Sequence, residues 1–129
     1  MRSAILVAIG LMMGFMSSSF ALNTLRQHHA FPRGVMMVLG HHHKQLKREL
    51  AQPQCDAQRI RTQLDALAVL SADIDAAYAP IDDARFSDFA DDLSTAIAHS
   101  RADDAQCPAV LERVKGIGDA CNACHRVYR

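Results

Sequence analysis

Five consecutive residues near the C-terminus have types and a spacing that could do chemistry: Cys121-Asn122-Ala123-Cys124-His125. On a helix, two cysteines three positions apart lie on one side, about one turn from each other. Each thiol can then add to one of two vinyl groups on a single porphyrin edge, while the imidazole of His125 points toward the iron. The motif therefore predicts attachment of a c-type haem. Thioredoxin-like redox sites and zinc knuckles share the cysteine spacing and are the alternatives.

The N-terminal segment has the pattern of an export signal. Arg2 supplies a positive charge, an apolar run extends from Ala4 to Phe15, and Ser19-Phe20-Ala21 has the small-x-small form of a cleavage site. We therefore expect residues 1–21 to be a signal peptide and export to lead to the periplasm, an oxidising compartment. The apolar run is short for a membrane span, and an uncleaved anchor is the alternative. Cleavage would leave residues 22–129, a length that fits one domain.

The rest of the chain contains four segments with helical periodicity, at about 33–51, 55–78, 83–101 and 108–128. In each segment apolar residues follow one face and charged residues occupy the opposite face. Pro32 comes just before the first segment, where a helix start tolerates proline. The connections are short, which implies antiparallel neighbours. The sequence therefore predicts an all-α fold, an up-down-up-down antiparallel four-helix bundle.

This topology places the start of the first helix and the end of the fourth helix at the same end of the bundle. Met36 and His125 lie on the inward stripes of these two helices. An iron between the helices could therefore take His125 on one side and Met36 on the other. A methionine on a helical stripe can also be a plain core residue. Met37 is a weaker candidate, because its heptad partners indicate an outer face.

Two further cysteines, Cys55 and Cys107, stand outside the haem motif. Cys55 opens the second predicted helix and Cys107 precedes the fourth, so both are expected at the end of the bundle away from His125. A disulfide between them would stabilise the fold by roughly 4 kcal/mol on the chain-entropy model. The alternatives are two free thiols or an intermolecular bridge that makes a dimer.

The C-terminal motif on the last helix of an exported bundle resembles the class II cytochromes c, the family of cytochrome c′ and cytochrome c-556. Gly118, the Tyr128-Arg129 ending and the segment 35–40 are similar to the family pattern. The resemblance implies one covalently bound haem c, a distal ligand at the place of Met36, and contact of Arg129 with a haem propionate or the proximal face.

The chain also departs from this family. Pro32 stands where family members usually carry an arginine, four residues before the distal position. The stretch between the second and third helices is shorter than usual, and the sequence contains no tryptophan. In length, residues 22–129 are similar to cytochrome b562, a bundle with Met and His ligands but without thioether bonds.

The distal residue decides which function the resemblance implies. With Met36 on the iron, the protein looks like the c-556 type, a six-coordinate carrier that exchanges single electrons with redox partner proteins. With Met36 off the iron, it resembles five-coordinate cytochromes c′ that bind NO or CO. Family members often form homodimers, and the sequence leaves this state open.

The other polar residues predict no enzyme activity. General acid–base pairs, nucleophilic triads and phosphate loops do not stand out. The side chains of His41-His42-His43 diverge by about 100° per residue on a helix, and His43 alone lies on the inward stripe. His28-His29 offer a bis-histidine alternative to Met36. The 14 basic residues are balanced by 14 acidic ones, which does not indicate nucleic-acid binding.

Overall fold

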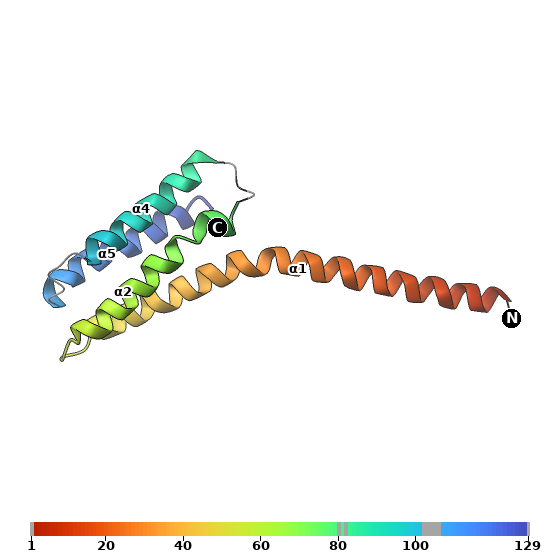
Figure 1. Ribbon diagram of the computed structural model, residues 1–129, viewed down its shortest axis with the longest axis horizontal. Helices are drawn as coiled ribbons and strands as arrows, with labels where there is room; N and C mark the ends of the chain where they lie inside the picture. Colours follow the sequence, from red (N-terminus) through yellow and green to blue (C-terminus); the bar gives the residue numbers. More distant parts are fainter. Residues whose placement is uncertain (1, 80, 82, 102–106, 129) are drawn as a thin grey trace. The chain divides into compact units, whose positions relative to one another are not determined.

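The structure, a computed structural model, describes residues 2–79, 81, 83–101 and 107–128; within these ranges the side chains at 2–9, 19–29, 107 and 108 are not described. The described residues form helices and contain no strand. The helices are α1 (Arg2–Leu50), α2 (Ala57–Ser71), α3 (Ile74–Ala77), α4 (Ala84–Arg101) and α5 (Cys107–His125), as drawn in Figure 1. The predicted all-α fold class is therefore confirmed.

The chain divides into two units, residues 1–33 and 34–129. The division falls just after Pro32, which lies inside α1. The prediction that a helix would start at Pro32 was therefore wrong, because the residues before it are helical too. Ala, Leu and Met are frequent in that stretch, and their high helix propensity outweighs the one backbone hydrogen bond that proline removes. Cleavage after Ala21 stays a prediction.

Large apolar side chains in the first unit are exposed. Leu11, Met12, Met13, Phe15 and Met16 leave between 63% and 75% of their surface accessible. They follow one another around the helix, so no single face is apolar, unlike the helices that cover a core. Within the described residues, no helix is both long enough and apolar enough to span a membrane.

The core of residues 34–129 receives buried aliphatic side chains from each of its helices. The most deeply buried include Leu46 of α1, Ile60 of α2, Ile97 of α4 and Ile117 of α5. Figure 1 shows α2, α4, α5 and the C-terminal part of α1 side by side around this core. Each such side chain contributes about 1.5–3 kcal/mol when removed from water. The apolar faces expected from helical periodicity are thus the buried faces.

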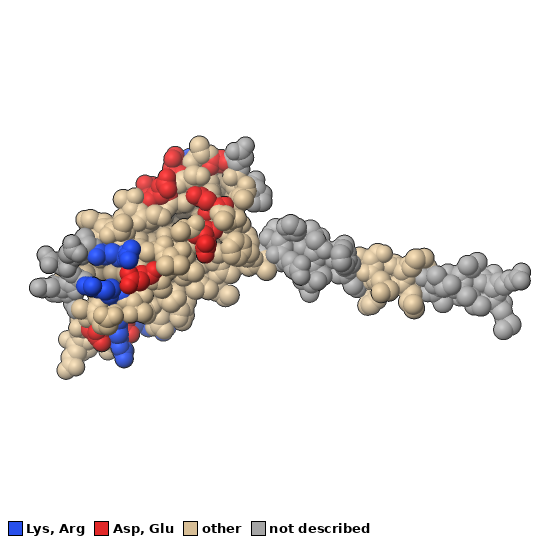
Figure 2. All heavy atoms as spheres, in the orientation of Figure 1, with Lys and Arg blue, Asp and Glu red and all other residues tan. Residues whose placement is uncertain are grey.

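Charged side chains lie on the outside of this unit. On the face shown in Figure 2, Lys and Arg gather toward one end, whereas Asp and Glu predominate toward the other. The two buried polar residues among those described are Ser71 and Ser100, and each hydroxyl donates to a backbone carbonyl of its own helix. Burial of these groups is therefore compensated by hydrogen bonds.

The second predicted helix, at 55–78, is interrupted in the structure: α2 ends at Ser71 and α3 begins at Ile74. The Ser71 hydroxyl donates to the Ala68 carbonyl at 3.0 Å, a local bond that competes with regular helix bonding. The backbone N–H of Asp73 donates to the Leu70 carbonyl at 3.2 Å, three residues back, as in a 3₁₀ turn. The break still leaves Ile74 buried in the core.

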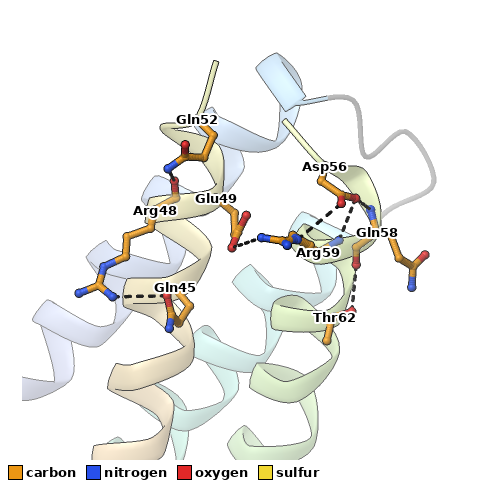
Figure 3. Close-up of polar contacts among 8 residues, drawn as sticks. All are labelled: Gln45, Arg48, Glu49, Gln52, Asp56, Gln58, Arg59 and Thr62. Carbon is orange, nitrogen blue, oxygen red and sulfur yellow. Dashed lines mark hydrogen bonds and ion pairs between the residues drawn. The ribbon is translucent and has the colours of Figure 1, made fainter. Parts of the chain in front are cut away.

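Asp56 determines where α2 begins. Its carboxylate accepts the backbone N–H groups of Gln58 at 2.9 Å and Arg59 at 3.3 Å (Figure 3), so Asp56 is the N-cap. The Arg59 guanidinium lies 3.7 Å from the Asp56 carboxylate and 3.5 Å from that of Glu49 on α1. With 67% of the Arg59 side chain exposed, these ion pairs contribute little, and the cap is the stronger contact.

The Asp56→Ala variant is expected to lower the free energy of unfolding by about 1 kcal/mol, because two amides at the start of α2 lose their acceptor. Urea denaturation followed by circular dichroism measures the change. Asp56→Asn keeps a capping oxygen and should stay close to the unmodified protein. An equal loss in both variants would assign the effect to the Arg59 ion pair instead of the cap.

Candidate functional site

A cavity of about 220 Å³ lies within residues 34–129, and its walls are mostly apolar. Met36 of α1 and Cys121, Cys124 and His125 of α5 all line it. The structure therefore brings the four haem-site residues predicted from the sequence to one cavity. An apolar hollow with a few convergent reactive groups is a common form of cofactor site.

The two methionines at the start of this unit lie in different environments. Met36 is partly buried and packs against the core, whereas Met37 leaves 72% of its surface exposed. The prediction that Met37 occupies an outer face is confirmed. Met36 is the methionine that faces the cavity.

Cys121 and Cys124 are free thiols, and both are partly buried. Burial raises the pKa of Cys121, and the nearby Cys124 raises it further. Burial also raises the pKa of Cys124. Reactive cysteines of disulfide oxidoreductases have lowered pKa values, so these two protonated thiols do not have the electrostatics of a thiol redox site. The described residues contain no group of three or more His, Cys, Asp or Glu that could hold a metal ion.

The remaining cysteine pair is described only in part. Cys55 is disulfide-bonded. The side chain of Cys107 lies outside the described residues, so its predicted pairing with Cys55 stays a prediction. Arg129 lies outside them as well, and its predicted contact with a propionate or the proximal face also stays a prediction.

His125 is the last residue of α5, which ends three residues earlier than the predicted segment 108–128. The backbone N–H groups of Val127 and Tyr128 both donate to the Cys124 carbonyl at 3.0 Å, which forms a closing turn. The turn directs Tyr128 back toward α4, where its ring contacts Phe86. The sequence periodicity predicted a helix up to residue 128, but the chain turns after His125 and Tyr128 packs on α4 instead.

The three consecutive histidines point to different surroundings. His41 is exposed, whereas the Nδ1 atom of His42 lies 2.8 Å from Oε1 of Gln63 on α2, within hydrogen-bond distance. His43 is the one that lines the cavity. The three side chains diverge as the sequence predicts. The side chains of His28 and His29 lie outside the described residues.

His43 and Gly118 mark where α1 and α5 lie opposite each other. A Cβ atom at Gly118 would lie 3.5 Å from Cε1 and 3.7 Å from Nε2 of His43, an ordinary van der Waals contact. Gly118 is therefore the α5 residue that faces the His43 imidazole. His43 and Gly118 thus lie opposite each other on α1 and α5.

Burial lowers the pKa of His43 from its ordinary value of 6.5, and the nearby Lys47 lowers it further. The His43 imidazole therefore binds a proton more readily in the unfolded chain than in the folded one. Its contribution to the free energy of unfolding is fully present above pH 6.5, where the imidazole is neutral in both states. It is lost as the pH falls through the lower folded pKa. When the pH is lowered from 7 to 5, the free energy of unfolding of haem-free His43→Gln should therefore fall by less than that of the haem-free unmodified protein.

Urea denaturation at both pH values measures this difference. His99→Gln is the matched control, because it removes a histidine that is exposed on α4 and does not line the cavity. Equal losses of stability in His43→Gln and the unmodified apoprotein would show that His43 is not the responsible group.

The aromatic part of the cavity wall was not predicted as part of the site. Phe86 and Phe89 of α4 line the cavity, and Tyr128 packs against both rings. The spacing of Phe86 and Phe89, three positions apart on the apolar face of a predicted helix, was a signal for neighbouring rings. Nothing local in the sequence indicates which helix end these rings would meet.

Comparison with family models, curated proteins and solved structures finds no match for this chain. Its function is therefore inferred from the residues that line the cavity.

Proposed function

We propose that this protein is a periplasmic c-type cytochrome of the class II kind, which carries single electrons through one covalently attached haem in an antiparallel four-helix bundle. The observation that carries the proposal is that Met36, Cys121, Cys124 and His125 line a single apolar cavity. The alternating directions of α1, α2, α4 and α5 in Figure 1 support the up-down-up-down topology.

The chemistry of the lining fits a c-type haem. Cys121 and Cys124 would hold it through thioether bonds, and His125 would ligate the iron. Apolar walls that include Phe86 and Ile117 would exclude water from the porphyrin faces. When bound, the haem supplies an iron that changes between the ferric and ferrous states, and a methionine ligand favours the ferrous state.

The alignment of α1 and α5 supports Met36 as the residue that would hold the iron together with His125. Gly118 faces His43, and the two helices run in opposite directions in Figure 1. His125 lies seven residues after Gly118, and Met36 lies seven residues before His43. Seven residues of α-helix correspond to about 10.5 Å along the axis. Because α1 and α5 are antiparallel, the step from Gly118 forward to His125 and the step from His43 back to Met36 run in the same direction in space. Met36 and His125 therefore lie at about the same height along the two helix axes.

Exposure of the site supports electron transfer to partner proteins. His125 is exposed although it lines the cavity, so an iron held by it would lie close to the surface. A redox partner protein could then approach the metal centre without entering the core.

The proposal is tested by optical spectra of the full chain produced with export and c-type cytochrome maturation. We expect a low-spin ferric spectrum with a Met–iron charge-transfer band, reversible one-electron reduction, and no uptake of CO by the ferrous protein at concentrations comparable to the haem. A high-spin ferric spectrum with ready CO binding would contradict the proposed electron-carrier function and would indicate a five-coordinate, gas-binding haem protein instead.

A further inference from the structure

A side-chain contact joins the C-terminal turn to the start of α4. The Tyr128 hydroxyl donates a hydrogen bond to Oδ2 of Asp83, 45 residues away in the sequence. The Arg85 guanidinium lies near both groups, and the electrostatic interaction of Tyr128 and Asp83 with it raises its pKa. Tyr128 is three residues beyond His125, so this contact fastens the segment that directly follows the predicted iron ligand.

Asp83 is itself held in place by α4. Its Oδ1 atom accepts the backbone N–H of Arg85 at 3.0 Å, and its carbonyl oxygen accepts the backbone N–H of Phe86 at 2.9 Å. Asp83 thus caps α4 with one carboxylate oxygen and receives Tyr128 with the other. The acceptor for Tyr128 is therefore part of a fixed helix end.

The Tyr128 ring makes a second connection to α4. It packs edge-to-face on Phe86, with ring centroids 5.3 Å apart, and on Phe89, with centroids 6.1 Å apart. Phe86 and Phe89 form part of the cavity wall. The C-terminal turn is thereby connected to the part of the cavity wall that α4 supplies.

The His125 imidazole is not held by a hydrogen bond to any other described residue. The residue is also exposed. Its orientation is therefore set by the backbone on either side, by α5 before it and by the turn after it. In that turn the N–H groups of Val127 and Tyr128 both donate to the carbonyl of Cys124, the residue just before His125.

We propose that Tyr128 is a positioning residue, which acts through Asp83 to hold the turn after α5 and so keep the His125 imidazole directed into the cavity. This inference rests on the proposed function, because it concerns His125 as an iron ligand. A tyrosine that only fastened the C-terminus would stabilise the fold without affecting the iron–histidine bond.

The test measures that bond in haem-loaded full-length protein. The ferrous nitric oxide adduct is six-coordinate while histidine stays on the iron and five-coordinate once histidine is released, and absorption spectra distinguish the two forms. In Tyr128→Phe, which keeps the ring but loses the hydroxyl, the ratio of five- to six-coordinate adduct should rise at least about threefold, the change that weakening of one hydrogen bond produces.

Asp83→Ser should give a similar rise, because serine still caps α4 but is too short to reach Tyr128. The double variant should rise no further than either single variant, since both remove the same contact. Thr62→Val is the control, because it removes a hydroxyl that donates to the Gln58 carbonyl within α2, and Thr62 does not line the cavity; it should leave the ratio unchanged.

An unchanged ratio in Tyr128→Phe, together with a lower midpoint of thermal unfolding, would overturn the positioning role and leave only a structural fastener. Additive effects in the double variant, or an unmodified protein that is already fully five-coordinate with nitric oxide, would overturn it as well. In these cases the haem stays attached and the proposed function stands. Absence of haem from the unmodified protein would overturn both proposals.

Discussion

Replacing Cys121 and Cys124 together with serine is expected to convert the haem from a covalently attached group to one that acid–acetone extracts completely. A serine hydroxyl does not form the thioether that a cysteine thiol forms with a vinyl group. The unmodified protein should retain nearly all its haem absorbance in the precipitated polypeptide. The double variant should release it to the organic phase, where absorbance measures it directly.

The matched control is Ala123→Ser, which introduces serine between the two cysteines and keeps both thiols. It should retain haem like the unmodified protein. Some haem should still bind the double variant before extraction, because His125, Met36 and the apolar walls are unchanged. Retention of haem by the double variant after extraction would contradict attachment through Cys121 and Cys124.

Replacing Met36 with alanine is expected to convert the ferric haem from low spin to high spin almost completely. The side chain that reaches the level of His125 from α1 would be shortened to a methyl group, which has no sulfur to donate to iron. The reduction potential should fall, because the thioether stabilises ferrous iron. The ferrous variant should also gain the ability to bind CO.

Met37→Ala is the control for this change. Met37 is the next residue of the same helix and is 72% exposed, so its removal should leave the spectrum and potential unchanged. Optical spectra and a redox titration of the three proteins give the comparison. Retention of the low-spin spectrum in Met36→Ala would show that another residue, such as one of the other histidines, occupies the second axial position.

Helical periodicity was enough to predict the packed elements of residues 34–129. Leu46, Ile60, Ile97 and Ile117 fall on the apolar stripes and are buried, because the same spacing that defines a stripe directs it into the core. The interruption after Ser71 was missed. It depends on a side-chain hydroxyl competing for a backbone carbonyl, which the stripe does not reveal.

The start of the first helix was also mispredicted. Proline is tolerated at a helix start and is unfavourable in a helix interior, so Pro32 indicated a boundary. In the structure it lies within α1 and coincides with the division between the two units at residue 33. The proline rule thus located a real boundary in the chain, but this boundary separates two units within one helix and is not the start of a helix.

The reactive part of the site followed from the sequence, whereas its supporting wall did not. Cysteine spacing and short loops together predicted that Met36, Cys121, Cys124 and His125 would meet, and all four line the cavity. The contact of Tyr128 with Asp83 joins residues 45 positions apart. Such a contact depends on how α4 and α5 pack, and neither residue carries a local signal for it.

The central claim, that a haem is bound through both cysteines, is tested most directly by mass spectrometry of one peptide. Trypsin should release residues 116–126, which contain Cys121 and Cys124, by cleavage after Lys115 and Arg126. From exported protein matured as a c-type cytochrome, this peptide should carry the mass of one haem and show no free thiol. A peptide with two free thiols, or with a disulfide between Cys121 and Cys124, would contradict the proposed cytochrome.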